Sequence, residues 1–434
     1  MWRAGSAILL SMILAAPSFA RTWRLTSDGT GDATTIQAGI DSSAVGDTLE
    51  LACGTFQEYG IQLTGGIVLR SETGDPDCAV IDGLDLGPVL VAVDLAETTV
   101  LEGITITGGA GGTGPAGGGG GLRCIRSALT VSDCMFTGNA SEFGGGMGCY
   151  ESSPRVSGCD FVGNSATATE WAAGGGMFCR DSAPVVQDCS FSSNTAFSTT
   201  VPGDGGAMFN QSGAAKLLDC RFLANSSGAG AGGLYVFDGE RSELTRCVFV
   251  DNTSGSGGAI FVETAFLEAV DCTLSHNEGE SGGAVFSSVW SNLTFTGCVF
   301  SENAAAPFAG GAILAWHTTS VIRHCLFLGN TTALDGGAMA CSGVTTTTFD
   351  GCRFVANTSL HHGGAIRGYF ANRLDITSCT FASNVAASQG GAIFYRQSGP
   401  LTAHRTIIAF SQATWAGAIG CLDSNQLTLT CCDL

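Results

Sequence analysis

The chain repeats one pattern of apolar and polar positions about every 27 residues. Each unit holds an alternating apolar pair such as Leu129-x-Val131, a one-residue slip in phase, and the motif Cys-x-Phe-x-x-Asn. A loop follows, and then a Gly-Gly-Ala run leads into another apolar segment, as at 390–394. Because side chains alternate between the two faces of a strand, each pair indicates a short strand and each slip indicates a corner.

This repeat predicts the architecture. The ring position holds Phe in every unit except the one with Leu274, and the amide position is always Asn. Three short strands and three corners in about 27 residues form one coil of a parallel β-helix, whose coils stack at the strand spacing of about 4.8 Å. We therefore predict an all-β, single-stranded solenoid. The motif begins at Cys134, Cys159, Cys189, Cys220, Cys247, Cys272, Cys298, Cys325, Cys352 and Cys379.

Stacking explains each residue type in the motif. The inward Cys and Phe side chains should form a thiol column and a ring column through the core. Asn at the corner is expected to adopt a left-handed backbone and to donate its amide to a carbonyl of the next coil. Unit length varies only between the Asn and the Gly-Gly pair. We expect loops at that corner to form a ridge, which is the default place for binding in a repeat protein.

The two ends depart from the repeat. Residues 1–20 have an apolar run and a small-x-small site, which predicts a signal peptide, with a buried helix as the alternative. Within the remaining 21–434, Ile36 and Ile40 follow two threonines that could cap a short helix over the open end of the core. The chain stops inside a unit at Leu434, so we expect either a truncated β-helix or another element that covers this end.

Composition narrows the class of partner. Apolar residues make up 44% of the 434 residues and charged residues only 13%, which argues against disorder. The formal charge of −20 would repel nucleic acid and anionic lipid, both of which are polyanions. No stretch is long and apolar enough to predict a transmembrane helix. We predict no cofactor.

Most of the 19 cysteines are predicted to be buried free thiols. Stacked side chains lie about 4.8 Å apart at Cβ, farther than the roughly 3.5 to 4.5 Å of a disulfide. Cys53 and Cys78 lie outside the columns and are the candidate disulfide pair. No CxxC pair has zinc-site spacing, so no metal site is predicted. A second column is expected from Cys124, Cys149, Cys179, Cys341 and Cys421, and Cys432 belongs to the first.

Two sets of residues are candidates for function. Asp188 and Asp219 occupy one position in neighbouring coils and are weak catalytic candidates, although Asp before a corner is more often a turn residue.

Aromatic residues form the second set. Trp316 and Tyr369 share a register two coils apart, with Trp290 and Tyr395 nearby. These rings are candidates for binding a sugar or a protein, and the alternative is that they are partly covered side chains at strand ends.

Residues 28–58, DGTGDATTIQAGIDSSAVGDTLELACGTFQE, resemble the opening of pectin-lyase-like right-handed β-helix proteins. The repeats, with Phe-x-x-Asn and Gly-Gly-Ala, resemble the chlamydial polymorphic outer-membrane protein repeat. Together the resemblances cover 28–434. They imply a right-handed parallel β-helix, and the second implies an adhesin.

We therefore predict an exported bacterial protein that is extracellular, on the cell surface or in the outer membrane. It would be a non-catalytic, adhesin-like scaffold that binds a glycan or a surface protein along one face, as a monomer or as part of a longer chain. One alternative is a polysaccharide lyase or glycoside hydrolase with its site on the variable loops near 160–220. Another is a passive spacer.

Overall fold

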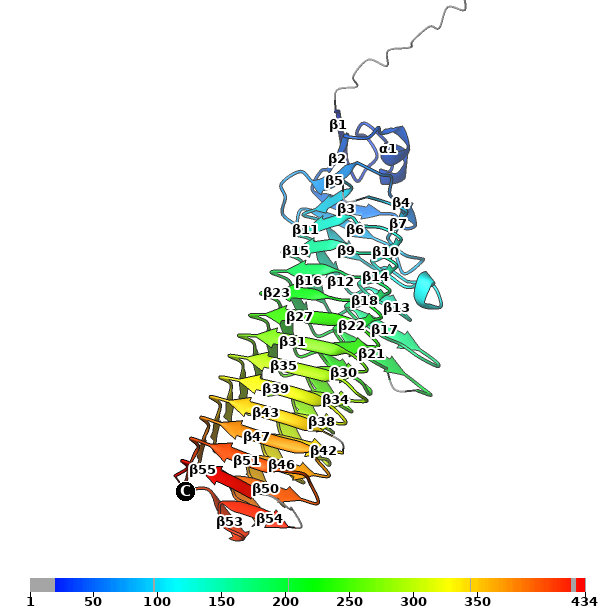
Figure 1. Cartoon of the computed structure of the whole chain (residues 1–434). Coiled ribbons are helices and arrows are strands. Elements are labelled where there is room, and N and C mark those ends of the chain that lie inside the picture. Colours follow the sequence, from blue (N-terminus) through cyan, green and yellow to red (C-terminus); the bar gives the residue numbers. More distant parts are fainter. Residues whose placement is uncertain (1–19, 97, 202, 344, 423–426, 434) are drawn as a thin grey trace, which may run out of the picture.

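The computed structural model describes residues 20–433 except 97, 202, 344 and 423–426, so the predicted signal peptide lies almost entirely outside it. From β1 (Thr22–Leu25) to β55 (Leu427–Thr430) the chain winds as one long solenoid (Figure 1). Every strand pair in it is parallel and pairs strands of successive coils, as in β11 with β15. The predicted all-β solenoid is confirmed. Among the described residues, no helix is long and apolar enough to cross a membrane.

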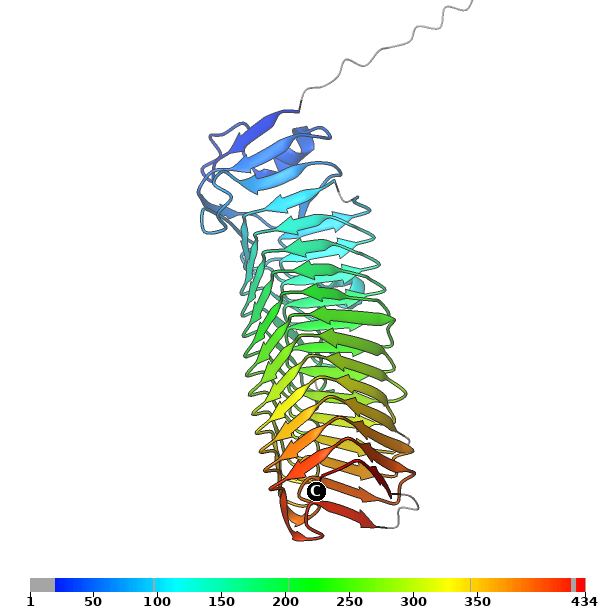
Figure 2. The same ribbon diagram turned by 60° about the vertical axis from the view of Figure 1, so that its left-hand side comes forward.

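One coil shows the plan of all of them. The chain passes through β11 (Thr130–Ser132), β12 (Met135–Thr137), β13 (Ala140–Ser141) and β14 (Met147–Tyr150) before the next coil begins. Equivalent strands stack into four sheets, which we name A, B, D and C in that order (Figure 2). Over the described residues, sheet A has 16 strands from β1 to β55, sheet B 14 from β3 (Gly54–Gln57) to β52 (Ile407–Ala409), sheet D 11 from β13 to β53 (Gln412–Trp415), and sheet C 14 from β4 (Ile61–Gln62) to β54 (Ile419–Leu422).

The fourth strand is a correction to the sequence analysis, which predicts three strands per coil. Sheet D consists of short strands directly after each Asn, such as Ala140–Ser141 paired with the start of β17 (Ser165–Ala168). These segments lack the alternating apolar pair by which strands are recognised in sequence. They pair because the Asn immediately before them holds neighbouring backbones in register.

The core contains the predicted columns. Phe136 and Phe161 stack with ring centroids 4.8 Å apart and planes 5° from parallel. The cysteines of the second column pair in register, as in Cys124 with Cys149. Seventeen of the described cysteines are outside any disulfide, and most of them are buried. Burial raises the pKa of the Cys159 thiol well above its ordinary value, so this thiol is neutral.

The asparagines form a continuous ladder. The Asn164 side chain donates to the Phe136 carbonyl (2.8 Å) and to the Asn194 Oδ1 (3.0 Å), and its own Oδ1 accepts from the Asn139 N–H (3.1 Å). The predicted left-handed backbone, however, belongs to the preceding residue, such as Gly163 with φ 61°. The turn is completed before the Asn because its side chain must point into the core.

A short helix covers the N-terminal end of the solenoid, as predicted (Figure 1). Helix α1 (Ile36–Ser42) begins after Thr35, whose side chain accepts a hydrogen bond from the Ala38 N–H. Ile36 and Ile40 are buried against the first coils. Of the two threonines proposed as caps, Thr35 is the cap. One further turn of 3₁₀ helix, η1 (Pro115–Gly117), lies in a loop.

Candidate functional site

Trp316 and Tyr369 lie in one register on the outer face of sheet C. Trp316 ends β38 (Ile313–Trp316) and Tyr369 ends β46 (Ile366–Tyr369). Ser342, at the end of the intervening strand, pairs with both of them, so the two rings are two coils apart. Trp316 is 47% exposed and Tyr369 is half-buried.

The corner that follows these strands adds more rings. Trp290 is 69% exposed and has a left-handed backbone. The His317 ring lies 5.9 Å from that of Trp290 and 5.3 Å from that of Trp316, between centroids. Phe370 is exposed, with its ring 4.3 Å from that of Tyr369. We name Trp290, Trp316, His317, Tyr369 and Phe370 the aromatic shelf.

Tyr395 does not belong to this surface, and its prediction as a binding residue is wrong. Its side chain is fully buried, and the ring fills the space beside Gly368, where an added Cβ would come within 2.3 Å of it. Tyr395 is five residues after Gly390, whereas Tyr369 is six residues after Gly363. An offset of one residue turns a side chain to the opposite face of the strand.

Beside Trp316, the outer face of sheet C has a hollow of about 440 Å³. Phe286 and Leu314 of sheet C form its floor, while Phe308 and Leu334 come from the variable corner. Phe308 is 50% exposed. A concave, mostly apolar surface with a few polar groups is typical of a ligand site.

Arg367 provides the polar end of this hollow. Its Nε lies 3.4 Å from the Asp335 carboxylate, and its Nη1 donates to the Ser342 Oγ (2.7 Å). Its guanidinium also lies over the Tyr369 ring, 4.5 Å from the centroid. Burial lowers the pKa of Arg367, and the nearby Asp335 charge opposes this. Arg367 is therefore a charged hydrogen-bond donor beside the shelf, and its charge is balanced by Asp335.

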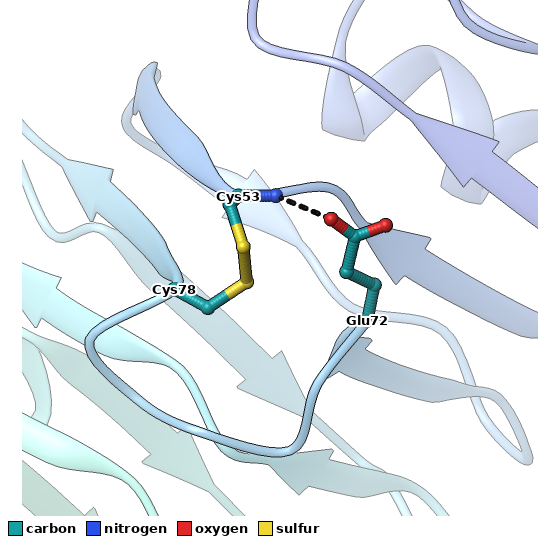
Figure 3. Close-up of side chains that lie close together, drawn as sticks. All are labelled: Cys53, Glu72 and Cys78. Carbon is teal, nitrogen blue, oxygen red and sulfur yellow. Dashed lines mark hydrogen bonds between the residues drawn. A yellow bond between two sulfur atoms is a disulfide. The ribbon is translucent and has the colours of Figure 1, made fainter.

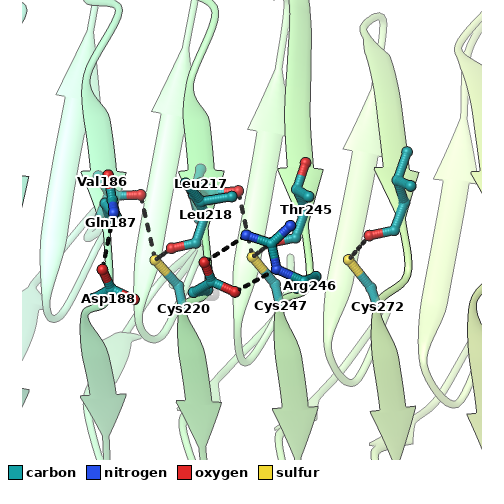
Figure 4. Close-up of polar contacts among 12 residues, drawn as sticks. Val186, Gln187, Asp188, Leu217, Leu218, Cys220, Thr245, Arg246, Cys247 and Cys272 are labelled. Carbon is teal, nitrogen blue, oxygen red and sulfur yellow. Dashed lines mark hydrogen bonds and ion pairs between the residues drawn. The ribbon is translucent and has the colours of Figure 1, made fainter.

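Asp188 lies at the corner after Gln187, as Figure 4 shows, and Asp219 holds the equivalent position directly before Cys220. Both have a left-handed backbone, with φ of 52° and 55°. Asp188 accepts a hydrogen bond from the Gln187 amide (2.9 Å). Asp219 accepts two from Arg246, each 2.7 Å, and this pairing lowers the pKa of Asp219. These contacts are those of corner residues, and they occupy the Asp219 carboxylate.

The sequence analysis missed Asp204, in the long loop after β21 (Thr195–Ser198). Its carboxylate accepts hydrogen bonds from the Trp171 indole (3.0 Å) and from the Gly230 N–H (3.0 Å). Burial raises its pKa to about 6. No sequence signal marks Asp204, because its burial depends on how the variable loops fold over sheet C.

Those loops cover a second apolar cluster on the outer face of sheet C, separate from the core inside the solenoid. The Trp171 ring lies 4.9 Å from that of Phe143 and 5.7 Å from that of Phe209, between centroids. In the same cluster, the Tyr235 hydroxyl donates to the Glu263 carboxylate. The loops after β17 and β21 project from the side of the solenoid in Figure 1.

Cys53 and Cys78 are joined by a disulfide, with Cα atoms 4.4 Å apart (Figure 3). Glu72 lies beside this pair, where one carboxylate oxygen accepts from the Cys53 N–H (3.0 Å) and the other from Arg24 (2.6 Å). The two sulfurs and the carboxylate are grouped closely, but the sulfurs are bonded to each other and the carboxylate is already paired. The group therefore ties the first coils together.

This coil geometry agrees with the comparison with protein families. The family described as "right handed beta helix region" matches residues 166–288 and 271–408, which together make up more than half of the chain. The protein belongs to this family, and the right-handed β-helix predicted from the sequence is confirmed. The narrower resemblance to the chlamydial repeat stays a prediction. No curated protein matches the chain.

The solved structures to which this chain is similar include proteins of different kinds. A pectin methylesterase from carrot is 11% identical, covering 70% of this chain and 85% of its own, with a TM-score of 0.27. PfbA, a surface adhesin of Streptococcus pneumoniae, is 10% identical, with coverages of 92% and 86% and a TM-score of 0.29. A PL6 family alginate lyase is 10% identical, with coverages of 94% and 89% and a TM-score of 0.25. These likenesses concern the fold alone.

Proposed function

We propose that this protein is an exported, non-catalytic scaffold of the bacterial surface that binds a glycan or a partner protein through the aromatic shelf. The observation that carries the proposal is the row of exposed rings beside a hollow of about 440 Å³ on one face of sheet C. Large exposed apolar side chains gathered on one face of a protein are typical of an interaction site. Export rests on the predicted signal peptide.

The test compares ligand binding by two tryptophan variants of the mature chain. A glycan array and a panel of bacterial and host surface proteins would identify a ligand. Trp316→Ala should then weaken binding about tenfold, because a buried aromatic contact contributes about 1 kcal/mol or more. Trp415→Ala is the matched control, since Trp415 is 69% exposed but lies in sheet D. Equal affinity of the two variants for every ligand found would contradict the proposal.

Polysaccharide cleavage is the second candidate, and Asp204 favours it. Its pKa of about 6 suits a group that exchanges protons near neutral pH, and it lies within the variable loops expected to hold such a site. Release of reducing ends or unsaturated products from a polymer, lost in Asp204→Asn, would establish cleavage. Product release that persists in Asp204→Asn would place the reaction elsewhere.

A further inference from the structure

We infer that the ligand of the aromatic shelf is a neutral, linear polysaccharide of equatorially 1,4-linked pyranose rings that runs parallel to the solenoid axis. The inference rests on the proposed function of the shelf and adds the class of ligand. It is carried by the spacing of the two strands that bear these rings and by the charge of the groups between them.

The spacing follows from the coils themselves. Phe300, Phe327 and Phe354 belong to the coils of Trp316, Ser342 and Tyr369, and their successive ring centroids are each 4.8 Å apart. The strands that carry Trp316 and Tyr369 are therefore roughly 9.6 Å apart, which is two strand spacings.

A 1,4-linked pyranose chain with equatorial bonds matches this period. Each ring advances the chain by about one strand spacing, roughly 5 Å, and successive rings are turned over. The same ring face therefore returns at every second sugar. One sugar can stack on Trp316, and the next but one can contact Tyr369 and the exposed Phe370 beside it, since the Arg367 guanidinium already lies over the Tyr369 ring. The sugar between them lies over the small side chain of Ser342. A chain with axial linkages curves, so its sugars would not stay aligned with both Trp316 and Tyr369.

The polar groups fit hydroxyls better than carboxylates. The middle sugar would face the Ser342 hydroxyl, which accepts a hydrogen bond from Arg367 Nη1 and can donate its own O–H to a sugar hydroxyl. The Arg367 charge is already balanced by Asp335, 3.4 Å away. The net charge of −20 adds a long-range repulsion against polyanionic glycans. A neutral polymer needs no unpaired positive charge on the protein and is not repelled by its net negative charge.

Calorimetric titration with β-1,4-linked glucose and N-acetylglucosamine oligomers of two to six rings tests the inference. Three rings are the first to reach both Trp316 and Tyr369, so affinity should rise at least tenfold between the disaccharide and the trisaccharide. The α-1,4-linked glucose oligomers and oligogalacturonides should bind at least tenfold more weakly. Tyr369→Ala should remove the rise, whereas Trp415→Ala should keep it.

A double variant tests the spacing without changing composition. Ser342→Tyr combined with Tyr369→Ser keeps one tyrosine and one serine but moves the ring to the coil next to Trp316. The trisaccharide rise should disappear in this variant, whose fold is checked by circular dichroism and thermal melting. A rise that survives the exchange, or is absent from the unmodified protein, would overturn the inference.

The outcomes also separate the inference from the proposed function. If an acidic glycan, an α-linked glycan or a protein binds and depends on Trp316, the shelf is a binding site but the inference is wrong. If no ligand depends on Trp316, both are wrong.

Discussion

At the scale of single residues, the side chains of the ladder asparagines provide hydrogen-bond partners for backbone groups at a buried corner. Asn303 donates to the Leu274 carbonyl (2.9 Å) and to Asn330 (2.9 Å), and accepts from the Asn277 backbone and side chain (3.0 Å each). Its side chain is fully buried. These bonds lie away from the solvent, so each one lost leaves a buried polar group without its partner.

Asn303→Ala should therefore lower the free energy of unfolding by about 3 kcal/mol, since several buried groups lose partners. Urea unfolding followed by circular dichroism measures the change. Asn292→Ala, on the partly exposed outer face of sheet A, is the control and should change it by less than about 0.5 kcal/mol. Similar losses in both variants would show that the ladder adds nothing specific.

Asp204, which is largely covered by the loops, makes stability depend on pH. Because its pKa is raised from 3.8 to about 6, the folded state holds this proton more tightly than the unfolded state does. Its favourable contribution is complete below pH 3.8 and is lost as the pH rises through about 6. The loss amounts to about 3 kcal/mol, from a shift of about two units.

Asp204→Asn should not show this loss. The difference in unfolding free energy between the variant and the unmodified protein should therefore move in favour of the variant between pH 4 and pH 7. Urea melts across this range measure it, with Asp188→Asn at the exposed corner as control. A difference that stays constant with pH would show that Asp204 titrates normally in the folded state.

At the scale of strands and columns, the thiols act as small apolar side chains. Fourteen of the described cysteines are buried outside any disulfide, and burial raises the pKa of Cys341 to about 11. A neutral, inaccessible thiol reacts slowly with disulfide reagents.

Thiol titration of the native protein should therefore label Cys431, which is exposed, and slowly Cys421 and Cys432. Denaturant should release the 14 buried thiols. Rapid labelling of all of them under native conditions, or disulfides between columns in a peptide map, would contradict this packing.

The sequence predicts the columns well because stacking repeats the same local contacts. Phe136 and Phe161 are recognised by period alone, and the same alternation separates Tyr369 from Tyr395 when the positions are counted from the Gly-Gly pair. Sheet D is harder to predict because its strands lack an apolar pattern. Asp204 lies beyond such reasoning, since its environment is made by loops of three different coils.

At the scale of the whole molecule, each coil contacts mainly its two neighbours. The free energy of unfolding of such an array is close to the sum of the stabilities of the single coils and of the interfaces between neighbouring coils. We therefore expect folding to depend on the alignment of equivalent residues in neighbouring coils, and not on the number of coils.

Deleting residues 220–246 removes one coil and joins Asp219 directly to Cys247. The shortened chain should fold, because each inward side chain meets its equivalent in the next coil, and its melting temperature should fall by only a few degrees. Deleting 220–233 removes about half a coil and should give insoluble protein. Circular dichroism, melting curves and size-exclusion chromatography measure both. Equal solubility of the two would argue against register as the deciding factor.

The units differ in length only at the corner between sheets D and C, and this indicates where the chain can accept an insertion. A guest peptide placed in the loop after β21 would extend outwards, with the Asn ladder on one side and the Gly-Gly pair on the other still holding the frame. The same insertion before a column cysteine would force two coils apart. Inserted segments of differing length could therefore be placed at a constant interval along the solenoid.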